Sequence, residues 1–225
     1  MLIVDEDDDY DIPDYIKNMP DKKLLFQNIN VPHLRSAAVV SQDDVTNYTD
    51  HNFEVTNTST TADILMLVNM QYIPIVQLEQ NKWHRLRMAM SSIDKTLGFL
   101  SENETCELKL IAKDGIFLND APRDITTVIL SPGNRADVAI RCSEIGLHNM
   151  TIAGRDRIPL VGGYGSFNPA TQPTIFVVDV VESSSTGVSE SSELEPFLAP
   201  TPCYLVDLQG IDPCDVTTTF TNVFH

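Results

Sequence analysis

The chain has 225 residues, enough for one large β domain or two small ones, and its hydrophobic fraction of 42% is ordinary for a folded protein. The 32 acidic and 15 basic side chains give a formal net charge of -17. That field repels phosphate backbones and anionic lipid, so we expect no nucleic-acid partner, and no apolar run approaches the ~20 residues that membrane insertion by a helix needs.

The amino-terminal residues have a mixed character. Residues 1–4 have the composition of a β-strand, and a run of five acids follows at residues 5–9. A solvated loop is favoured there over a calcium site, because the run lacks the ligand spacing and the glycine of an EF-hand. Residues 12–19 are compatible with a helical turn.

From residue 24 onward, short runs with strand character alternate with turn residues. Residues 64–68 are apolar throughout, as in a strand buried on both faces, and Pro74 makes 73–78 an edge strand or a strand entry. Many short strands at this spacing predict an all-β sandwich or barrel. The predicted strands are residues 24–29, 64–68, 73–78, 83–88, 106–112, 125–130, 136–142, 149–153 and 174–181.

Composition changes near the carboxyl end. Residues 182–195 are rich in Ser and Glu and hold too little apolar surface to bury, which predicts a mobile linker. Residues 203–208 look like a new strand, with no room for a further domain before His225. We therefore expect one whole domain with part of another on each side, in a fragment of a longer polypeptide.

The cysteines favour disulfide bonds over metal binding. They are even in number and fit no Cys-x-x-Cys metal spacing, and they are Cys106, Cys142, Cys203 and Cys214. Buried free thiols are the alternative. Cys106 opens one predicted strand and Cys142 closes another, so an antiparallel pairing of these strands would bring the thiols together and stabilise the fold by roughly 4–5 kcal/mol. Cys203 and Cys214 are the remaining pair.

Four Asn-x-Ser/Thr sequons are candidate glycosylation sites if the chain passes through a secretory pathway; they begin at Asn47, Asn57, Asn103 and Asn149. Disulfides also persist in oxidising compartments. The amino terminus lacks the basic flank and longer apolar core of a signal peptide. These observations agree if Met1 is not the natural start, so we expect a secreted or extracellular protein.

Three motifs resemble the second domain of multicopper oxidases. Residues 67–70 (LVNM), followed by Pro74 and residues 83–87 (WHRLR), resemble the family's "LVNG…P…RLR" signature, with Met70 in place of the usual glycine. Residues 111–115 (IAKDG) are similar to its "IAxDG", and residues 130–138 (LSPGNRADV) to its "LxPGxRxDV". The resemblance covers nearly the whole chain, because residues 1–4 are similar to the last strand of the first domain and residues 204–208 to the opening of the third.

This resemblance implies a cupredoxin-like Greek-key β-sandwich and a domain plan. Residues 1–22 would be the remnant of a first cupredoxin-like domain, 23–182 the second domain, 183–200 a Ser/Glu-rich linker and 201–225 the start of a third domain. Flanking cupredoxin domains of the same polypeptide are the expected partners. The full-length protein would oxidise phenolic, amine or metal-ion substrates and reduce dioxygen to water.

The charged motif residues have structural rather than catalytic roles in this interpretation. Arg135 and Asp137 share one face of a strand, as do Arg85 and Arg87, because side chains alternate with a period of two. We expect Arg135 and Asp137 to hydrogen-bond to each other or to neighbouring loops. For Arg85 and Arg87, partly buried arginine–carboxylate bridges are favoured over substrate binding.

No catalytic, cofactor-binding or metal-ligating residue is predicted in this chain. Copper needs converging imidazole and thiolate donors, which the family supplies from paired His-x-His and His-Cys-His motifs in its first and third domains. Here no two histidines lie within two residues of each other; they are His33, His51, His84, His148 and His225. We expect copper in the full-length protein, none bound by this chain, and no activity of the chain alone. The alternative function is a non-enzymatic extracellular β-sandwich for binding or adhesion.

Overall fold

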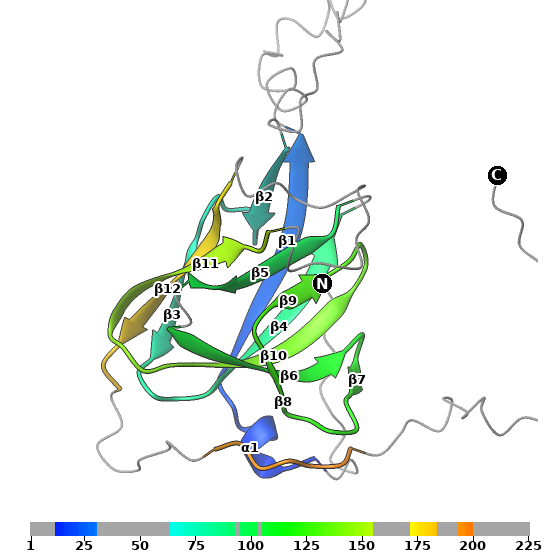
Figure 1. The fold of residues 1–225 in the computed structure, drawn as a ribbon, viewed down its shortest axis with the longest axis vertical. Helices are drawn as coiled ribbons and strands as arrows, with labels where there is room; N and C mark the ends of the chain where they lie inside the picture. The colour runs from blue at the N-terminus through cyan, green and yellow to red at the C-terminus, as the bar shows by residue number, and fades with distance from the viewer. Residues whose placement is uncertain are drawn as a thin grey trace, which may run out of the picture.

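The computed structural model describes residues 12–30, 64–92, 95–102, 105–154, 172–183 and 193–199. In these residues two β-sheets form a sandwich, with one short helix, α1 (Asp14–Lys17), at its base (Figure 1). The seven-stranded sheet contains β1 (Asp21–Asn30), β2 (Ile64–Val68), β4 (His84–Ser91), β6 (Cys106–Lys113), β7 (Ile116–Phe117), β8 (Arg123–Ile125) and β10 (Arg135–Cys142). The five-stranded sheet contains β3 (Ile75–Glu79), β5 (Leu97–Ser101), β9 (Val128–Leu130), β11 (Gly146–Ile152) and β12 (Thr174–Val181).

Both sheets are mixed. The larger has the order β2-β1-β4-β10-β6-β7, with β8 also paired to β6, and the smaller has the order β3-β12-β11-β5-β9. Strand β1 runs parallel to β4, and β3 runs parallel to β12, while the other pairs are antiparallel. The chain passes repeatedly from one sheet to the other, so strands that are neighbours in sequence often lie in opposite layers of the sandwich.

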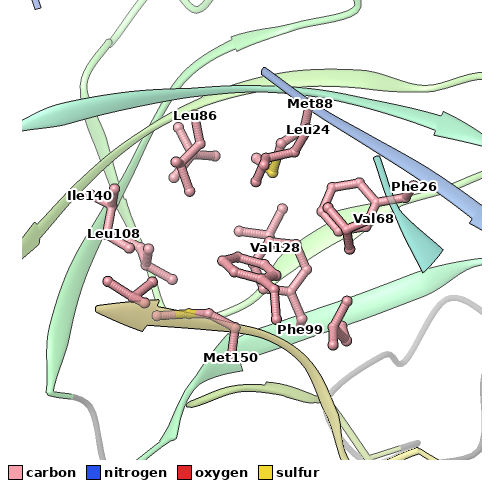
Figure 2. Close-up of a cluster of buried hydrophobic side chains, with 14 of the residues drawn as sticks. Leu24, Phe26, Val68, Leu86, Met88, Phe99, Leu108, Val128, Ile140 and Met150 are labelled. Atoms are coloured by element: carbon pink, nitrogen blue, oxygen red, sulfur yellow. The ribbon is translucent and has the colours of Figure 1, made fainter. Parts of the chain in front are cut away.

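The core lies between the two sheets. Phe26, Phe99 and Phe176 meet at its centre, with ring centroids 5.6–6.3 Å apart, and all three are fully buried. Figure 2 shows side chains from both layers packed together in this core, among them Leu86 of β4 and Met150 of β11. Alternate residues of each strand point into this core, and the intervening ones form the outer faces of the sandwich.

The structure differs from the expected strands in several places, among them the short strand β7, which was not predicted. Strand β2 is not buried on both faces: Met66 and Val68 are fully buried, but Leu65 and Leu67 are only half-buried, because β2 ends the order of its sheet. Residues 125–130 are divided between the end of β8 and β9. Strand β5, which was not predicted, contains a glycine that weakens its strand signal. The edge position of β3 and a helical turn within 12–19 are as expected.

A two-residue turn at Asn69 and Met70 follows β2. Both residues have positive φ, 51° and 66°, and Val68 and Gln71 exchange backbone hydrogen bonds of 2.9 and 3.0 Å across the turn. Two positive φ values define a turn in which Asn-Gly is the preferred pair. Asn69 also accepts a hydrogen bond from the Leu25 amide at 2.9 Å and donates one to the Lys23 carbonyl at 2.9 Å.

Replacing Met70 by glycine is expected to raise the free energy of unfolding by about 1 kcal/mol, because glycine adopts positive φ without the steric penalty of a Cβ. The methionine side chain is 70% exposed, so little packing is lost. Urea unfolding followed by far-UV circular dichroism measures the change. Asn69→Gly is the matched control and is expected to destabilise the fold, since it removes two hydrogen bonds. A lower stability of Met70→Gly would contradict the prediction.

Candidate functional site on the outer face of the seven-stranded sheet

Charged side chains cover the centre of the outer face of the seven-stranded sheet. Asp137 of β10 accepts hydrogen bonds from Arg85 Nε at 3.0 Å and from Arg85 Nη2 at 2.5 Å, both through Oδ2. Arg87 Nε lies 3.7 Å from the same oxygen, and Arg87 Nη1 lies 3.6 Å from Asp21 Oδ2. The Arg85 and Arg87 side chains are only 5% and 8% exposed. The two arginines therefore depend on carboxylate partners, as the sequence predicted.

Arg135 is not part of this network, although it lies on the same strand as Asp137. Its backbone amide donates to Asp114 Oδ1 at 2.8 Å, and its Nη2 donates to the Asp114 carbonyl at 2.6 Å. Asn134 Nδ2 also donates to Asp114 Oδ2 at 3.0 Å. Asp114 thereby joins the turn after β6 to the turn before β10. The "IAxDG"-like and "LxPGxRxDV"-like motifs act together as a connection between loops, which is the role expected for Arg135.

Trp83 forms a platform for two cations beside this network. The Arg141 guanidinium carbon lies 4.5 Å from the centroid of the Trp83 ring system, and Lys109 Nζ lies 5.9 Å from it. Contacts of this kind are attractive because the cation faces the negative surface of the ring. The Lys109 and Arg141 side chains are only 8% and 13% exposed. Sequence reasoning did not identify this platform, because its members come from separate strands and the loop before β4.

An acidic side chain from the carboxyl-terminal part of the chain binds both cations. Glu193 Oε1 lies 2.6 Å from Lys109 Nζ, and Glu193 Oε2 lies 3.6 Å from Arg141 Nη2. Asp124 Oδ1 is a second partner of Lys109, also at 2.6 Å. Burial opposes the charge of Lys109, but the hydrogen bonds to Asp124 and Glu193 outweigh it and raise the pKa of the ammonium group. The hydrogen bond from Lys109 in turn lowers the pKa of the Glu193 carboxyl group.

Two segments from opposite ends of the described chain lie together on this face, and we call residues 12–19 and 193–199 the clasp (Figure 1). Ile16 is fully buried and Leu194 is 9% exposed, in one cluster with Trp83. The Tyr15 hydroxyl donates to the Glu195 carbonyl, and the Phe197 amide donates to the Ala121 carbonyl at 2.9 Å. The clasp therefore ties the two segments to each other as well as to the sheet.

The clasp corrects the expectation that residues 182–195 hold too little apolar surface to bury. The average composition of this stretch does not show that Leu194 packs into an apolar cluster and that Glu193 contacts two cations of the sheet. Residues 184–192 of the predicted linker lie outside the described part of the chain. Residues 193–195 of the predicted linker thus pack against the sandwich.

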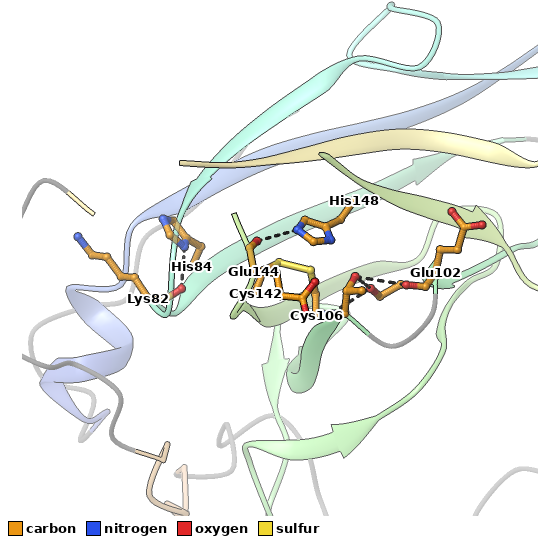
Figure 3. The surroundings of a disulfide bond; sticks show 9 residues. Lys82, His84, Glu102, Cys106, Cys142, Glu144 and His148 are labelled. Atoms are coloured by element: carbon orange, nitrogen blue, oxygen red, sulfur yellow. Dashed lines mark hydrogen bonds between the residues drawn. A yellow bond between two sulfur atoms is a disulfide. The ribbon is translucent and has the colours of Figure 1, made fainter. Parts of the chain in front are cut away.

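The two described histidines are engaged in hydrogen bonds. His84 Nδ1 donates to the Lys82 carbonyl at 3.0 Å and His84 Nε2 accepts from the Glu79 amide at 3.3 Å, so both ring nitrogens are occupied. Burial lowers the pKa of His84, which favours this neutral form. His148 Nε2 lies 2.7 Å from the Glu144 carbonyl oxygen (Figure 3). His33, His51 and His225 lie outside the described residues.

This donor set does not fit a copper ion. In the described ranges no group of three or more His, Cys, Asp or Glu side chains is placed to hold a metal. His84 would have to give up a hydrogen bond before one of its ring nitrogens could bind copper. A blue-copper site needs imidazole and thiolate donors that converge on the metal. The chemistry of these residues is that of a structural face, on which ionic and apolar contacts hold two chain segments in place.

A disulfide joins Cys106 and Cys142, the pair that the sequence predicted. The two residues face each other directly in the ladder between β6 and β10, with their α-carbons 4.2 Å apart (Figure 3). Both cysteines are buried, and neither is available as a thiolate. Cys203 and Cys214 lie outside the described residues, as do the sequons at Asn47, Asn57 and Asn103. Within the described part of the chain, no helix is long and apolar enough to cross a membrane.

The comparisons with known sequences found no matching family model and no matching curated protein. Solved structures do match. A laccase-like multicopper oxidase, CueO, from a lignin-degrading Ochrobactrum species is 16% identical, with a TM-score of 0.53 over 81% of this chain and 35% of that chain. A multicopper oxidase from Pseudomonas thermotolerans is 18% identical, with a TM-score of 0.48 over 80% of this chain and 36% of that chain.

A multicopper oxidase from Campylobacter jejuni, described as a metallo-oxidase, is 15% identical, with a TM-score of 0.48 over 87% of this chain and 35% of that chain. The likeness to the Ochrobactrum enzyme shows the fold: the sandwich is cupredoxin-like, as the sequence predicted. The chain spans about a third of the length of that enzyme.

Proposed function

We propose that this chain is the copper-free central scaffold domain of a multicopper oxidase, and that parts of the same polypeptide on either side carry the copper. The clasp is the observation that carries this proposal. Residues 12–19 and 193–199 are bound side by side on one sheet face, so the polypeptide enters and leaves the sandwich at fixed points. A domain whose task is to position its neighbours needs such an arrangement.

Two further observations support this role. The sandwich has the fold found in a laccase-like multicopper oxidase, of which the match covers 35%, and its described histidines are hydrogen-bonded to backbone groups. Burial of an apolar side chain such as Leu194 contributes about 2 kcal/mol to the docking of its segment. Glu193 adds an ionic contact with two poorly exposed cations. The segment is thus held by both apolar and charged groups.

The activity belongs, in this proposal, to the full-length protein. It oxidises phenolic, amine or metal-ion substrates and reduces dioxygen to water, with copper supplied by the flanking cupredoxin domains. The residues of this chain bind no substrate in this proposal. They fix the positions of the flanking domains through the clasp. The Cys106–Cys142 disulfide is consistent with a secreted protein, because such bonds persist in oxidising compartments.

Metal analysis tests whether copper binding and oxidation lie outside this chain. The isolated chain, exposed to copper and then dialysed, is expected to retain no stoichiometric copper and to oxidise neither phenols nor ferrous iron. The full-length protein is expected to retain copper and to oxidise its substrate. About one tightly bound copper per isolated chain would contradict the proposal. A full-length protein that binds no copper and consumes no dioxygen would instead indicate the extracellular binding module.

Leu194→Ser tests the clasp. Trp83 is the only tryptophan of the chain and lies in the same cluster as Leu194, so undocking of residues 193–199 exposes it. Loss of about 2 kcal/mol of apolar burial lowers the ratio of docked to undocked clasp about 30-fold. We expect the tryptophan emission to move to longer wavelength without a change in far-UV circular dichroism.

Leu198→Ser is the matched control for the clasp, because Leu198 is 81% exposed although it lies only four residues away. Its emission spectrum is expected to match that of the wild type. In the full-length protein, Leu194→Ser is expected to reduce dioxygen consumption while Leu198→Ser does not. Equal emission spectra and equal activities of the two variants would show that the clasp has no positioning role.

A further inference from the structure

The outer face of the five-stranded sheet carries exposed apolar side chains. In the register of this sheet, Ile75 of β3 lies opposite Val177 of β12, and Val177 lies opposite Asn149 of β11. Leu147 lies two residues before Asn149, on the same face. Ile75 is 64% and Leu147 67% exposed. We call Ile75, Leu147 and Val177 the apolar row.

The two outer faces of the sandwich differ. The clasp lies on the seven-stranded sheet, whereas no described segment covers the apolar row. Strand β3 also ends the order of its sheet, with β12 as its partner there (Figure 1). An exposed edge strand beside exposed apolar side chains favours association with other chains unless something covers it.

The sequon Asn149-Met150-Thr151 lies on this face. Met150 is fully buried in the core, so the alternation of the strand directs Asn149 and Thr151 outward. Asn149 is exposed, and its amide nitrogen donates a hydrogen bond to Glu102 Oε2 at 2.8 Å. An asparagine amide has two hydrogens, so a bond from Nδ2 to a sugar replaces one of them and leaves the other for Glu102.

We propose that Asn149 carries an N-linked glycan, and that this glycan covers the apolar row. The donor is an oligosaccharide linked to a lipid diphosphate. The bond between its anomeric carbon and the diphosphate oxygen breaks, a bond from Nδ2 of Asn149 to that carbon forms, and the amide releases one proton to solvent. The lipid diphosphate is the leaving group, and no oxidation or reduction takes place.

The geometry of the sheet places the apolar row within reach of such a glycan. Neighbouring strands lie about 4.8 Å apart, so β3 is about 10 Å from β11 across the sheet. A core glycan of several sugar rings spans this distance along the line from Asn149 over Val177 to Ile75. The C–H faces of the sugars cover the aliphatic side chains, while the hydroxyl groups face water. The glycan therefore hides apolar surface beside the open edge of β3.

The test uses the 225-residue chain secreted from a glycosylating eukaryotic host behind a heterologous signal peptide. Peptide mapping after enzymatic release of glycans is expected to recover position 149 as aspartate, from a chain in which Cys106 and Cys142 are disulfide-bonded. Thr151→Ala removes the sequon and is expected to lose this glycan. Thr151→Ser is the matched control, since it changes the same side chain and keeps the sequon. Unmodified Asn149 in the secreted, disulfide-bonded chain would overturn the proposal.

The covering role has a separate readout. Thr151→Ala is expected to bind at least twice as much of a dye that senses apolar surface as Thr151→Ser. It is also expected to elute earlier from a sizing column, because chains with an uncovered apolar row associate. Adding Leu147→Thr to Thr151→Ala removes part of the apolar row without restoring the glycan, and is expected to reverse both changes. Equal dye binding and equal elution of the Thr151→Ala and Thr151→Ser chains would show that a glycan at Asn149 covers nothing.

Discussion

Replacing both Cys106 and Cys142 by alanine is expected to lower the free energy of unfolding by about 4 kcal/mol. The bridge closes a loop with a sequence separation of 36. In the chain-entropy model, such a loop restricts the unfolded chain by about this amount. The bridge also joins β6 and β10, two adjacent strands of the seven-stranded sheet. The midpoint of urea unfolding, measured without reductant, reports the change.

Reduction of the wild-type chain separates the covalent link from the effect of removing two buried sulfur atoms. Reductant is expected to bring the wild-type midpoint close to that of the double alanine variant measured in the same reductant. The reduced wild type retains its side-chain volumes, so any remaining difference between the two measures packing. A wild-type midpoint that does not respond to reductant would show that the bridge contributes no stability.

The sequence was sufficient to predict those features that depend on local patterns. The alternation in residues 106–112 predicted strand β6, and the disulfide was predicted on the condition that this strand pairs antiparallel with the strand that Cys142 closes, which is the pairing found. Pro74 indicated an edge strand or a strand entry, because proline cannot donate to a central ladder; it directly precedes β3, which is an edge strand. The shared faces of Arg85 and Arg87 indicated an ionic bridge, and the structure supplies Asp137 as its carboxylate.

Features that depend on distant segments could not be predicted in this way. A period of two does not reveal strand direction, so the parallel pairs of β1 with β4 and of β3 with β12 had no signal. The clasp is a second example. Leu194 and Glu193 lie in a Ser/Glu-rich stretch, and only the folded sheet brings Trp83, Lys109 and Arg141 together to receive them.

Asp137→Ala is expected to destabilise the fold by about 3 kcal/mol, because it removes a carboxylate that is paired with two buried arginines. Asp137 Oδ2 accepts two hydrogen bonds from Arg85 and lies 3.7 Å from Arg87 Nε. Neither arginine can reach bulk water without disturbing the sheet, since their side chains are only 5% and 8% exposed. Asp21 remains near Arg87, but Arg85 loses the carboxylate described for it. The midpoint of urea unfolding measures the loss.

Two variants show whether burial is the cause of that loss. Asp120→Ala removes a carboxylate that also lies 2.5 Å from an arginine, Arg123, but on the surface, where the side chains are 61% and 53% exposed. Exposed ion pairs contribute little, so its midpoint is expected to stay at the wild-type value. Arg85→Met combined with Asp137→Ala removes the arginine together with its carboxylate and is expected to be more stable than Asp137→Ala alone. If Asp137→Ala and Asp120→Ala unfold at the same urea concentration, the buried network does not hold this face of the sheet together.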